Sequence, residues 1–436
     1  MQSGHRPARP EWDGIMADKH RDQILVLGAG VVGLACAVEL QNRGFSVSLI
    51  DADTPGGGCS YGNAGIIAAS EIFPIISPAR LISLPRMLAS SDGPVAVRFS
   101  ALPRLSPWLL RAAASLRARR QREIIKGLAA LNKEAISAWR HLLQICGASN
   151  LMIERGMIGL TRRAGANLPL EKGRQTLGDW DLRSQILTAH EVRELEPNLH
   201  RSVSGGLLHE SDAHVADPLT VSKALLARFL GRRGQLLRQR VEAILPSDKG
   251  CHVRTNVETH FAELVVVALG IESGKILSPL GVSVPLQAER GYHLNLHCGG
   301  DMLHRPVTFL EESCVATPMA GFLRLAGTVE FAGPHTSPTW RRADRLRAVA
   351  QRYFEPELPE TNGDRWMGSR PSLPDSLPAI GRLNSFPRVS YAFGHQHLGL
   401  TQAAISAKLI ADLSILERSS VDHRPYALER FGVLRR

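Results

Sequence analysis

The chain has 436 residues and a formal net charge of +11, carried mostly by arginine. This length predicts two or three domains, and the lack of an apolar run of about 20 residues argues against a transmembrane helix. No DNA- or RNA-binding motif accompanies the charge. We therefore expect an anionic small molecule or an anionic membrane surface as partner, and no nucleic acid.

Residues 1–21 are polar and basic and lack the apolar core of a signal peptide, which predicts a disordered extension on a cytoplasmic protein. The chain has six cysteines, at positions 36, 59, 146, 251, 298 and 314. They form neither a C-x-x-C pair nor a group with zinc spacing, so we expect reduced thiols and no metal site.

The first ordered segment predicts a βαβ unit. An apolar run at 23–28 indicates a buried strand, 33–44 has helical periodicity, and 46–51 indicates a second strand. The sequence GAGVVG joins the first strand to the helix and comprises Gly28, Ala29, Gly30, Val31, Val32 and Gly33.

This glycine-rich turn predicts a dinucleotide site. Gly28 permits a tight turn, Gly30 a close approach of a pyrophosphate, and Gly33 close packing of helix on strand. The free N–H groups at the helix N-terminus favour phosphate binding. Asp51 ends the second strand, where its carboxylate can accept hydrogen bonds from a ribose. The motif alone does not separate NAD from FAD.

The rest of the chain alternates between mixed and strand-rich segments. Residues 121–147 predict one long amphipathic helix, and 221–234 predict another. Residues 235–244 predict two short strands, 262–270 a buried strand, 286–330 several strands, 340–353 a helix and 401–416 a C-terminal helix. Residues 72–110 contain many prolines and no clear period.

The sequence SYGNAG follows the second strand with an unusually small, apolar loop at Ser60–Gly65. It resembles the S-x-x-N-A-G loop of the D-amino-acid oxidase superfamily of FAD enzymes, and the bacterial D-amino-acid dehydrogenases (small subunit type) most of all. In that family the loop lies against the pyrophosphate and the isoalloxazine ring, because a flat ring needs small side chains beside it. The match assigns cofactor contacts to Ser60, Asn63, Ala64 and Gly65.

Three more segments resemble the same family: 265–273, 368–381 and 394–403. The resemblance implies further FAD contacts, and a helix N-terminus that would stabilise the charge of reduced flavin. The contacts are Val241, Ala268, Gly270, Gly394, Leu398, Gly399, Leu400 and Thr401. Because 368–381 contains no cysteine, we expect FAD to be bound non-covalently.

The resemblance also implies that Arg370 pairs with the substrate carboxylate, which a planar guanidinium binds with two nitrogens. The alternative is an ordinary ion pair with a nearby acid. Tyr292 is a candidate for the same carboxylate, or a half-buried strand tyrosine. His395 is a candidate catalytic residue that, like His293 and His397, would tune the pocket or the flavin, or serve a structural role.

The predicted function is FAD-dependent oxidation of a D-amino acid, with D-proline and hydroxy-D-proline among the candidates. A hydride passes to flavin N5, and the electrons go on to a quinone or another respiratory-chain acceptor. Alternatives are a glycine- or sarcosine-type oxidase using oxygen, an NAD-dependent dehydrogenase, and a non-catalytic FAD subunit of an electron-transfer complex. Residues 98–122 combine apolar residues with arginines. They predict either packing within the substrate domain or peripheral contact with the inner face of the cytoplasmic membrane.

The predicted fold class is α/β. A Rossmann-like FAD-binding domain is built from discontinuous segments, and an inserted α+β substrate domain contains a mainly antiparallel sheet. We assign 22–100, 191–285 and 362–436 to the FAD-binding domain, and 101–190 with 286–361 to the substrate domain.

Overall fold

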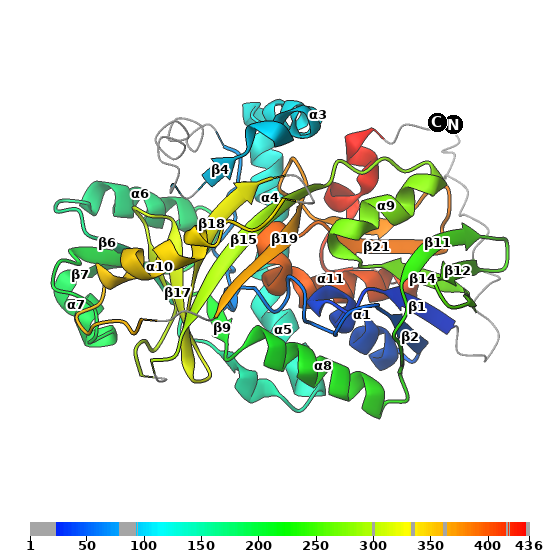
Figure 1. Cartoon of the computed structure of the whole chain (residues 1–436), viewed down its shortest axis with the longest axis horizontal. Helices are drawn as coiled ribbons and strands as arrows, with labels where there is room; N and C mark the ends of the chain where they lie inside the picture. Colours follow the sequence, from blue (N-terminus) through cyan, green and yellow to red (C-terminus); the bar gives the residue numbers. More distant parts are fainter. Residues whose placement is uncertain are drawn as a thin grey trace, which may run out of the picture.

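The computed structural model describes residues 23–77, 93, 95–298, 301–332, 336–360, 364–415, 417 and 419–432. The predicted extension at 1–21 lies outside these residues. Two large sheets dominate the molecule and lie toward opposite ends of its long axis (Figure 1). No helix among the described residues is both long and apolar enough to cross a bilayer.

The first sheet has six strands in the order β10-β2-β1-β14-β21-β20. All neighbours pair in parallel except β20 and β21, which are antiparallel. The strands are β1 (Gln23–Leu27), β2 (Ser46–Ile50), β10 (Gln235–Leu237), β14 (Leu264–Val267), β20 (Ala379–Arg382) and β21 (Val389–Phe393).

This sheet is buried on both faces, which explains why its strands read as continuous apolar runs. Ile24 and Val26 belong to one apolar cluster, and Leu25 and Leu27 to another, because alternate side chains point to opposite faces. The first cluster includes α1 (Val31–Asn42), α5 (Ala135–Ile145), α8 (Pro218–Gly231) and α11 (Gly399–Ser414). The second includes α9 (Ser273–Leu277) and a small sheet of β11 (Val241–Pro246), β12 (Cys251–Thr255) and β13 (Thr259–Ala262).

The second sheet has nine strands and is mainly antiparallel, as predicted. Eight follow the order β19-β15-β18-β17-β16-β6-β8-β7, and the ninth, β4, pairs with β18. Only β16 with β6 and β18 with β4 run parallel. The strands are β4 (Val95–Val97), β6 (Met157–Thr161), β7 (Ser184–Thr188), β8 (Gly205–His209), β15 (Gln287–Leu296), β16 (Val307–Phe309), β17 (Cys314–Met319), β18 (Phe322–Phe331) and β19 (Arg365–Ser372).

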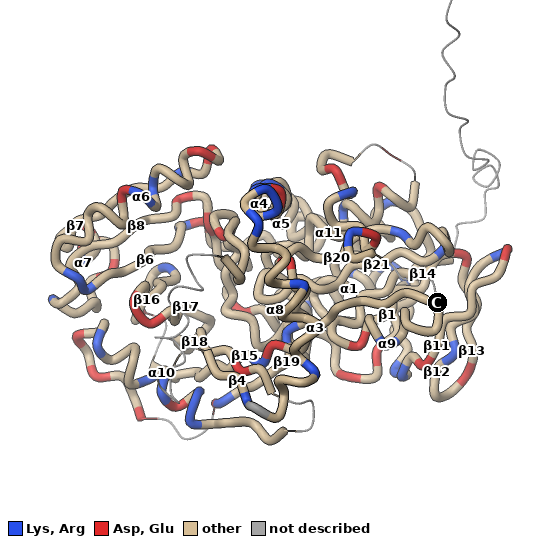
Figure 2. The backbone as a smooth tube through the Cα atoms, turned by 90° about the horizontal axis from the view of Figure 1, so that it is seen from above, with Lys and Arg blue, Asp and Glu red and all other residues tan. Residues whose placement is uncertain are grey.

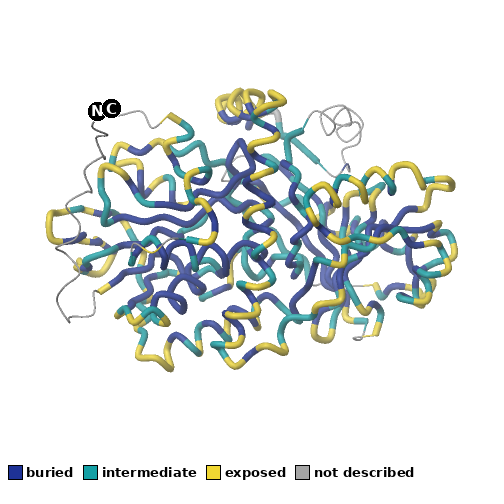
Figure 3. The backbone as a smooth tube through the Cα atoms, turned by 180° about the vertical axis from the view of Figure 1, so that it is seen from behind, coloured by how far each residue is buried: buried dark blue, intermediate teal, exposed yellow. Residues whose placement is uncertain are grey.

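Helices surround this sheet, and their outer faces are exposed (Figure 3). They are α3 (Leu102–Ala114), α6 (Asn167–Gly178), α7 (Ala189–Leu195) and α10 (Arg341–Gln351). Helix α4 (Ala118–Lys133) instead packs in the first apolar cluster, against α5 and α11. The single helix predicted over 121–147 is wrong, because α4 ends and α5 begins at Glu134. The break lets the Trp139 indole of α5 donate to the carbonyl of Leu400 at 2.7 Å and anchor α5 to α11.

The predicted domain boundaries remain a proposal, and the strand pairing suggests a revision. β4, β8 and β19 belong to the antiparallel sheet, although their residues fall in segments that we assigned to the FAD-binding domain. We propose that these three strands belong to the substrate domain. The chain then crosses between the two sheets at more places than the sequence predicts.

Candidate active site

The predicted glycine-rich turn joins β1 to α1 with geometry that only glycine permits. Gly28 has φ +103°, and a Cβ there would overlap the carbonyl oxygen of Ala268. A Cβ on Gly33 would overlap the carbonyl oxygen of Gly28. The turn is therefore packed tightly on its protein side, and this compactness suits a backbone that must approach a pyrophosphate.

Asp51 and Ser60 both meet this turn. The Asp51 carboxylate accepts hydrogen bonds from the N–H groups of Ala29 at 2.6 Å and Asp53 at 2.8 Å. The Ser60 hydroxyl oxygen accepts from the N–H of Val31 at 2.8 Å. The two side chains predicted to contact the ribose and the pyrophosphate thus lie at the N-terminus of α1.

The loop of Ser60–Gly65 is held over this turn by its own side chains and by α11. Asn63 accepts from the N–H of Gly65 at 2.9 Å and donates to the carbonyl of His397 at 3.4 Å. The Thr401 hydroxyl oxygen accepts from the N–H of Ala68 at 3.0 Å. The glycine-rich turn, the loop of Ser60–Gly65 and the segment 394–403 therefore meet at one place.

Beyond Gly65, which has φ +77°, the chain forms the short strand β3 (Ile66–Ile67). This strand pairs with β9 (Ala213–Val215), which also pairs with β5 (Met152–Ile153). The loop is thus fixed at both ends, by α1 and by a three-stranded sheet.

Ala268 and Gly270 follow β14, the strand beside β1. Gly270 has φ +56°, and a Cβ there would meet nothing within 4 Å, so the space beside it is open. Val241 begins β11 and packs against the apolar cluster that contains Leu27. These predicted cofactor contacts thus surround the end of the parallel sheet where the glycine-rich turn lies.

His395 lies just before α11, but its contacts favour the structural alternative. Its Nε2 lies 2.9 Å from the hydroxyl oxygen of Ser406, within α11 itself. Burial lowers the pKa of His395 to about 3, so the ring is neutral at physiological pH. Gly394 precedes it with φ +80°, and Leu398 and Leu400 are buried. The catalytic role of His395 stays a prediction.

One face of the large sheet lies against the loop. Residues 289, 291 and 293 of β15 pair with residues 370, 368 and 366 of β19, so their side chains share a face. We call Glu289, Gly291, His293, Trp366, Gly368 and Arg370 the substrate face. The Trp366 ring fills the space beside Gly62 and Gly368, where a Cβ on either glycine would overlap it.

Aromatic rings hold the Trp366 indole in place. It stacks on the His293 ring, with centroids 5.1 Å apart and planes at 18°. Tyr61 packs edge-on at 6.5 Å. His293 Nδ1 lies 3.3 Å from the carbonyl oxygen of Gly62, and its pKa is lowered to about 3 by burial and by the charges of Arg324 and Arg370. His293 is therefore a neutral ring.

Arg370 lies on the substrate face as predicted, with its guanidinium over Gly291. Its Nη1 donates to Glu289 at 3.4 Å, and the other carboxylate oxygen of Glu289 accepts from the Ser372 hydroxyl at 2.8 Å. The ion pair that we considered as an alternative is thus present. Among the described residues Arg370 makes no other hydrogen bond, so Nε and Nη2 keep donor capacity for a ligand.

Sequence reasoning missed Arg324 of β18. Its side chain is 0% exposed, and its Nη1 donates to the carbonyls of Tyr61 and Asn63, each at 2.7 Å. Its Nε donates to the Asn295 side chain at 3.0 Å. Burial lowers the pKa of Arg324. Arg324 thus ties the large sheet to the loop; the sequence signal is a charge inside the apolar run 322–326 of this strand.

Tyr292 points away from the substrate face. Its hydroxyl donates to Glu330 at 2.6 Å and accepts from the N–H of Thr339 at 3.0 Å. The ring is 0% exposed. Its proposed contact with a substrate carboxylate stays a prediction, and these contacts favour the structural alternative.

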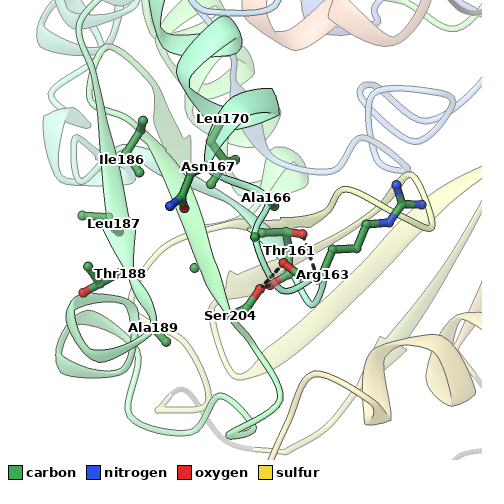
Figure 4. Close-up of a pocket in the computed structure, with 12 residues that line it drawn as sticks. Thr161, Arg163, Ala166, Asn167, Leu170, Ile186, Leu187, Thr188, Ala189 and Ser204 are labelled. Atoms are coloured by element: carbon green, nitrogen blue, oxygen red, sulfur yellow. Dashed lines mark hydrogen bonds between the residues drawn. The ribbon is translucent and has the colours of Figure 1, made fainter.

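A cavity of about 140 Å³ lies elsewhere, between α6, β7 and the segment after β6. Its lining includes Thr161, Asn167 and Ser204, and Ser204 donates to the carbonyls of Thr161 and Arg163 (Figure 4). These elements lie at the opposite end of the molecule from β1 and α1 (Figure 1). None of the predicted site residues lines this cavity.

A parallel sheet with a glycine-rich turn, covered by a second loop and joined to an antiparallel sheet, defines a two-domain dinucleotide-dependent oxidoreductase. Residues 23–413 match the family described as FAD dependent oxidoreductase (DAO). The chain belongs to this family, and its cofactor is FAD. This confirms the choice of FAD over NAD that the loop of Ser60–Gly65 predicted.

The chain is similar to several curated proteins along nearly its whole length. It is 32% identical to a D-amino-acid oxidase of Bradyrhizobium diazoefficiens, with 94% of this chain and 98% of that protein covered. It is 29% identical to D-amino acid dehydrogenase 2 of Pseudomonas aeruginosa, with 95% and 98% covered.

Solved structures show the same fold. Glycine oxidase from Geobacillus kaustophilus superposes with a TM-score of 0.72 at 20% identity, over 94% of this chain and 99% of that one. L-proline dehydrogenase from P. horikoshii superposes with a TM-score of 0.69 at 17% identity, over 94% and 98%. The predicted α/β fold with an inserted antiparallel sheet is therefore confirmed.

Proposed function

We propose that this protein oxidises a D-amino acid to its imine. Water then hydrolyses the imine of a primary amine to a 2-oxo acid and ammonia, whereas D-proline would give a cyclic imine. The observation that carries the proposal is the unused donor capacity of Arg370 on a sheet face that lies against the loop of Ser60–Gly65. FAD supplies the oxidising chemistry by accepting a hydride at N5. The chain's own residues bind the two molecules and hold them together.

The proposed FAD site fits the residues at the N-terminus of α1. The backbone of Gly28–Gly33 and the N–H groups of α1 would hold the pyrophosphate, and Asp51 the ribose. Asp51 and Ser60 each keep acceptor capacity beyond the hydrogen bonds described above. The beginning of α11 would face the pyrimidine end of the flavin, and its positive dipole would stabilise the charge of the reduced form.

The proposed substrate site lies between the substrate face and the loop. Arg370 would bind the α-carboxylate with Nε and Nη2. The Trp366 indole reaches over Gly368, which lies directly across from Gly291, where the Arg370 guanidinium rests. Such cross-strand positions lie about 5 Å apart. The side chain of a substrate whose carboxylate is bound by Arg370 would therefore contact the Trp366 indole. We infer a substrate with a small or ring-shaped neutral side chain, D-proline and hydroxy-D-proline included.

The electron acceptor is a separate part of the proposal. The relative at 32% identity is named an oxidase, and the one at 29% a dehydrogenase. We propose a quinone or another respiratory-chain acceptor, with oxygen as the alternative. Peroxide formation at the rate of substrate oxidation would favour oxygen. Reduction of a quinone analogue without peroxide would favour the respiratory chain.

Helix α3 is the proposed place of contact with the inner face of the cytoplasmic membrane. Its buried side, with Leu105 and Trp108, packs on the protein. Its outer side exposes Leu109 by 40% and Leu110 by 73%, beside the exposed Arg111. Figure 2 shows where lysines and arginines lie along the backbone. Exposed leucines flanked by arginines suit an anionic lipid surface. Sedimentation with anionic vesicles should fall in a Leu109→Ser, Leu110→Ser variant; unchanged sedimentation would contradict this contact.

Anaerobic flavin absorbance tests the proposed reaction. Neutral D-amino acids should bleach the flavin band near 450 nm, with D-alanine and D-proline among the fastest. If no amino acid bleaches the flavin, the proposed reaction is wrong.

A further inference from the structure

Glu289 is a buried carboxylate on the substrate face that the proposed reaction leaves without a role. Its side chain is 3% exposed, against 16% for Arg370, and the two are paired at 3.4 Å. Ser372 fixes the other carboxylate oxygen, and the carbonyl of Ser372 accepts from the Trp108 indole at 3.1 Å. The position of this negative charge is therefore well defined.

We propose that Glu289 makes the Arg370 anchor selective for amino acids over carboxylates that lack an amino group. This inference rests on the proposed function, in which Arg370 binds the α-carboxylate. It adds a specificity-determining residue that acts by repulsion.

The first step is the charge balance around one guanidinium. A ligand carboxylate on the Nε and Nη2 edge shares the guanidinium with Glu289, which already occupies Nη1. From the geometry of the fork, the two carboxylates would lie about 6 Å apart. At an effective dielectric constant of about 20, that repulsion corresponds to about a hundredfold in binding constant.

The second step is the amino group. An amino acid zwitterion carries its ammonium next to its carboxylate, so its charge centre offsets the repulsion from Glu289. A plain carboxylate or a 2-oxo acid has no such compensation. The product, once hydrolysed to the 2-oxo acid, is therefore bound more weakly than the substrate, and this asymmetry favours its release.

The competing interpretation is that Glu289 only holds Arg370 in place. The two interpretations predict opposite results for Glu289→Gln, which keeps the shape and the acceptor oxygen but removes the charge. If Glu289 only holds Arg370 in place, the variant should bind every carboxylate ligand more weakly. If the charge of Glu289 provides selectivity, the variant should bind ligands without an amino group more tightly, and amino acids equally well or more weakly.

The experiment compares two ligands on the FAD-loaded protein. Propanoate binding is measured from the change in flavin absorbance. Substrate affinity is measured as KM for D-alanine or D-proline, whichever reduces the wild-type flavin faster. The control is Glu196→Gln, since Glu196 is also buried and pairs with Arg305 at 3.1 Å. Glu196 directly follows α7, which lies far from β15 and β19 (Figure 1).

Glu289→Gln should bind propanoate at least tenfold more tightly, with a KM that does not fall, while the control variant changes neither. Ser372→Ala, which loosens the same carboxylate, should shift propanoate binding in the same direction by less. Weaker binding of both ligands, or an unchanged ratio of the propanoate dissociation constant to KM, would overturn the inference. Failure of the proposed function is distinct, because wild-type flavin would then be reduced by no amino acid.

Discussion

Replacing Arg324 by methionine should weaken FAD binding although Arg324 is not predicted to touch the cofactor. The guanidinium donates to two loop carbonyls, those of Tyr61 and Asn63, and to the Asn295 side chain. Hydrogen bonds to charged groups contribute about 1.5–3 kcal/mol each. The cost of burying the guanidinium offsets part of this, so we expect a net loss of about 3 kcal/mol at the loop.

In the variant, FAD binding must supply this free energy to order the loop of Ser60–Gly65. The FAD dissociation constant should therefore rise about a hundredfold. The assay is FAD titration of the apoprotein by flavin fluorescence. The matched control is Arg347→Met, because Arg347 of α10 also donates to backbone carbonyls, those of Leu358 and Pro359, without touching the loop. Equal FAD affinity in Arg324→Met and wild type would refute the pinning role.

Three further predictions concern the turn, the ribose contact and acid stability. Gly28→Ala should abolish FAD binding, checked by flavin content after purification, because its Cβ overlaps the Ala268 carbonyl at φ +103°. Asp51→Asn should raise the FAD dissociation constant about tenfold in the same titration, because a charged acceptor is lost. The buried rings of His214, His293 and His395 have lowered pKa values of about 4, 3 and 3. At these three rings the unfolded chain binds more protons than the folded one below pH 6.5, so their contribution to stability falls as pH falls; the raised pKa of buried Asp212, about 7, offsets part of this loss. Each ring should lower the free energy of unfolding by about 2 kcal/mol at pH 5. Chemical unfolding at pH 7.5 and pH 5 measures this difference, and equal stability at both pH values would contradict it.

The cofactor half of the site could be predicted because its signals are local. A strand, a glycine-rich turn and a helix follow one another in 23–44, and the structure gives a steric reason for glycine at Gly28 and Gly33. The loop of Ser60–Gly65 follows directly, so its place over the turn needs no long-range information.

The substrate half depends on strand register, which the sequence does not reveal. Tyr292 and His293 are neighbours on β15, and only the pairing with β19 decides which one faces the loop. A register shift against β18 between these two residues makes the choice harder still. Glu289 and Arg324 were missed for the same reason, since a buried charge in a strand becomes meaningful only once its partner is known.

The sequence pattern also did not predict the break between α4 and α5. Apolar residues keep their helical spacing on both sides of Glu134, so periodicity alone predicts one helix. The packing of Trp139 against α11 decides the matter, and that contact joins residues 261 positions apart.

The most direct test of the proposed reaction is anaerobic flavin reduction by matched D- and L-amino acids, in wild type and in Arg370→Met. We predict that neutral D-amino acids bleach the wild-type flavin and their L-enantiomers do not. In Arg370→Met, with full FAD content, half-maximal reduction should need about a hundredfold more substrate, as expected for loss of a charge-assisted bidentate contact. Bleaching of Arg370→Met at wild-type substrate concentrations would contradict the carboxylate anchor on which the proposed function depends.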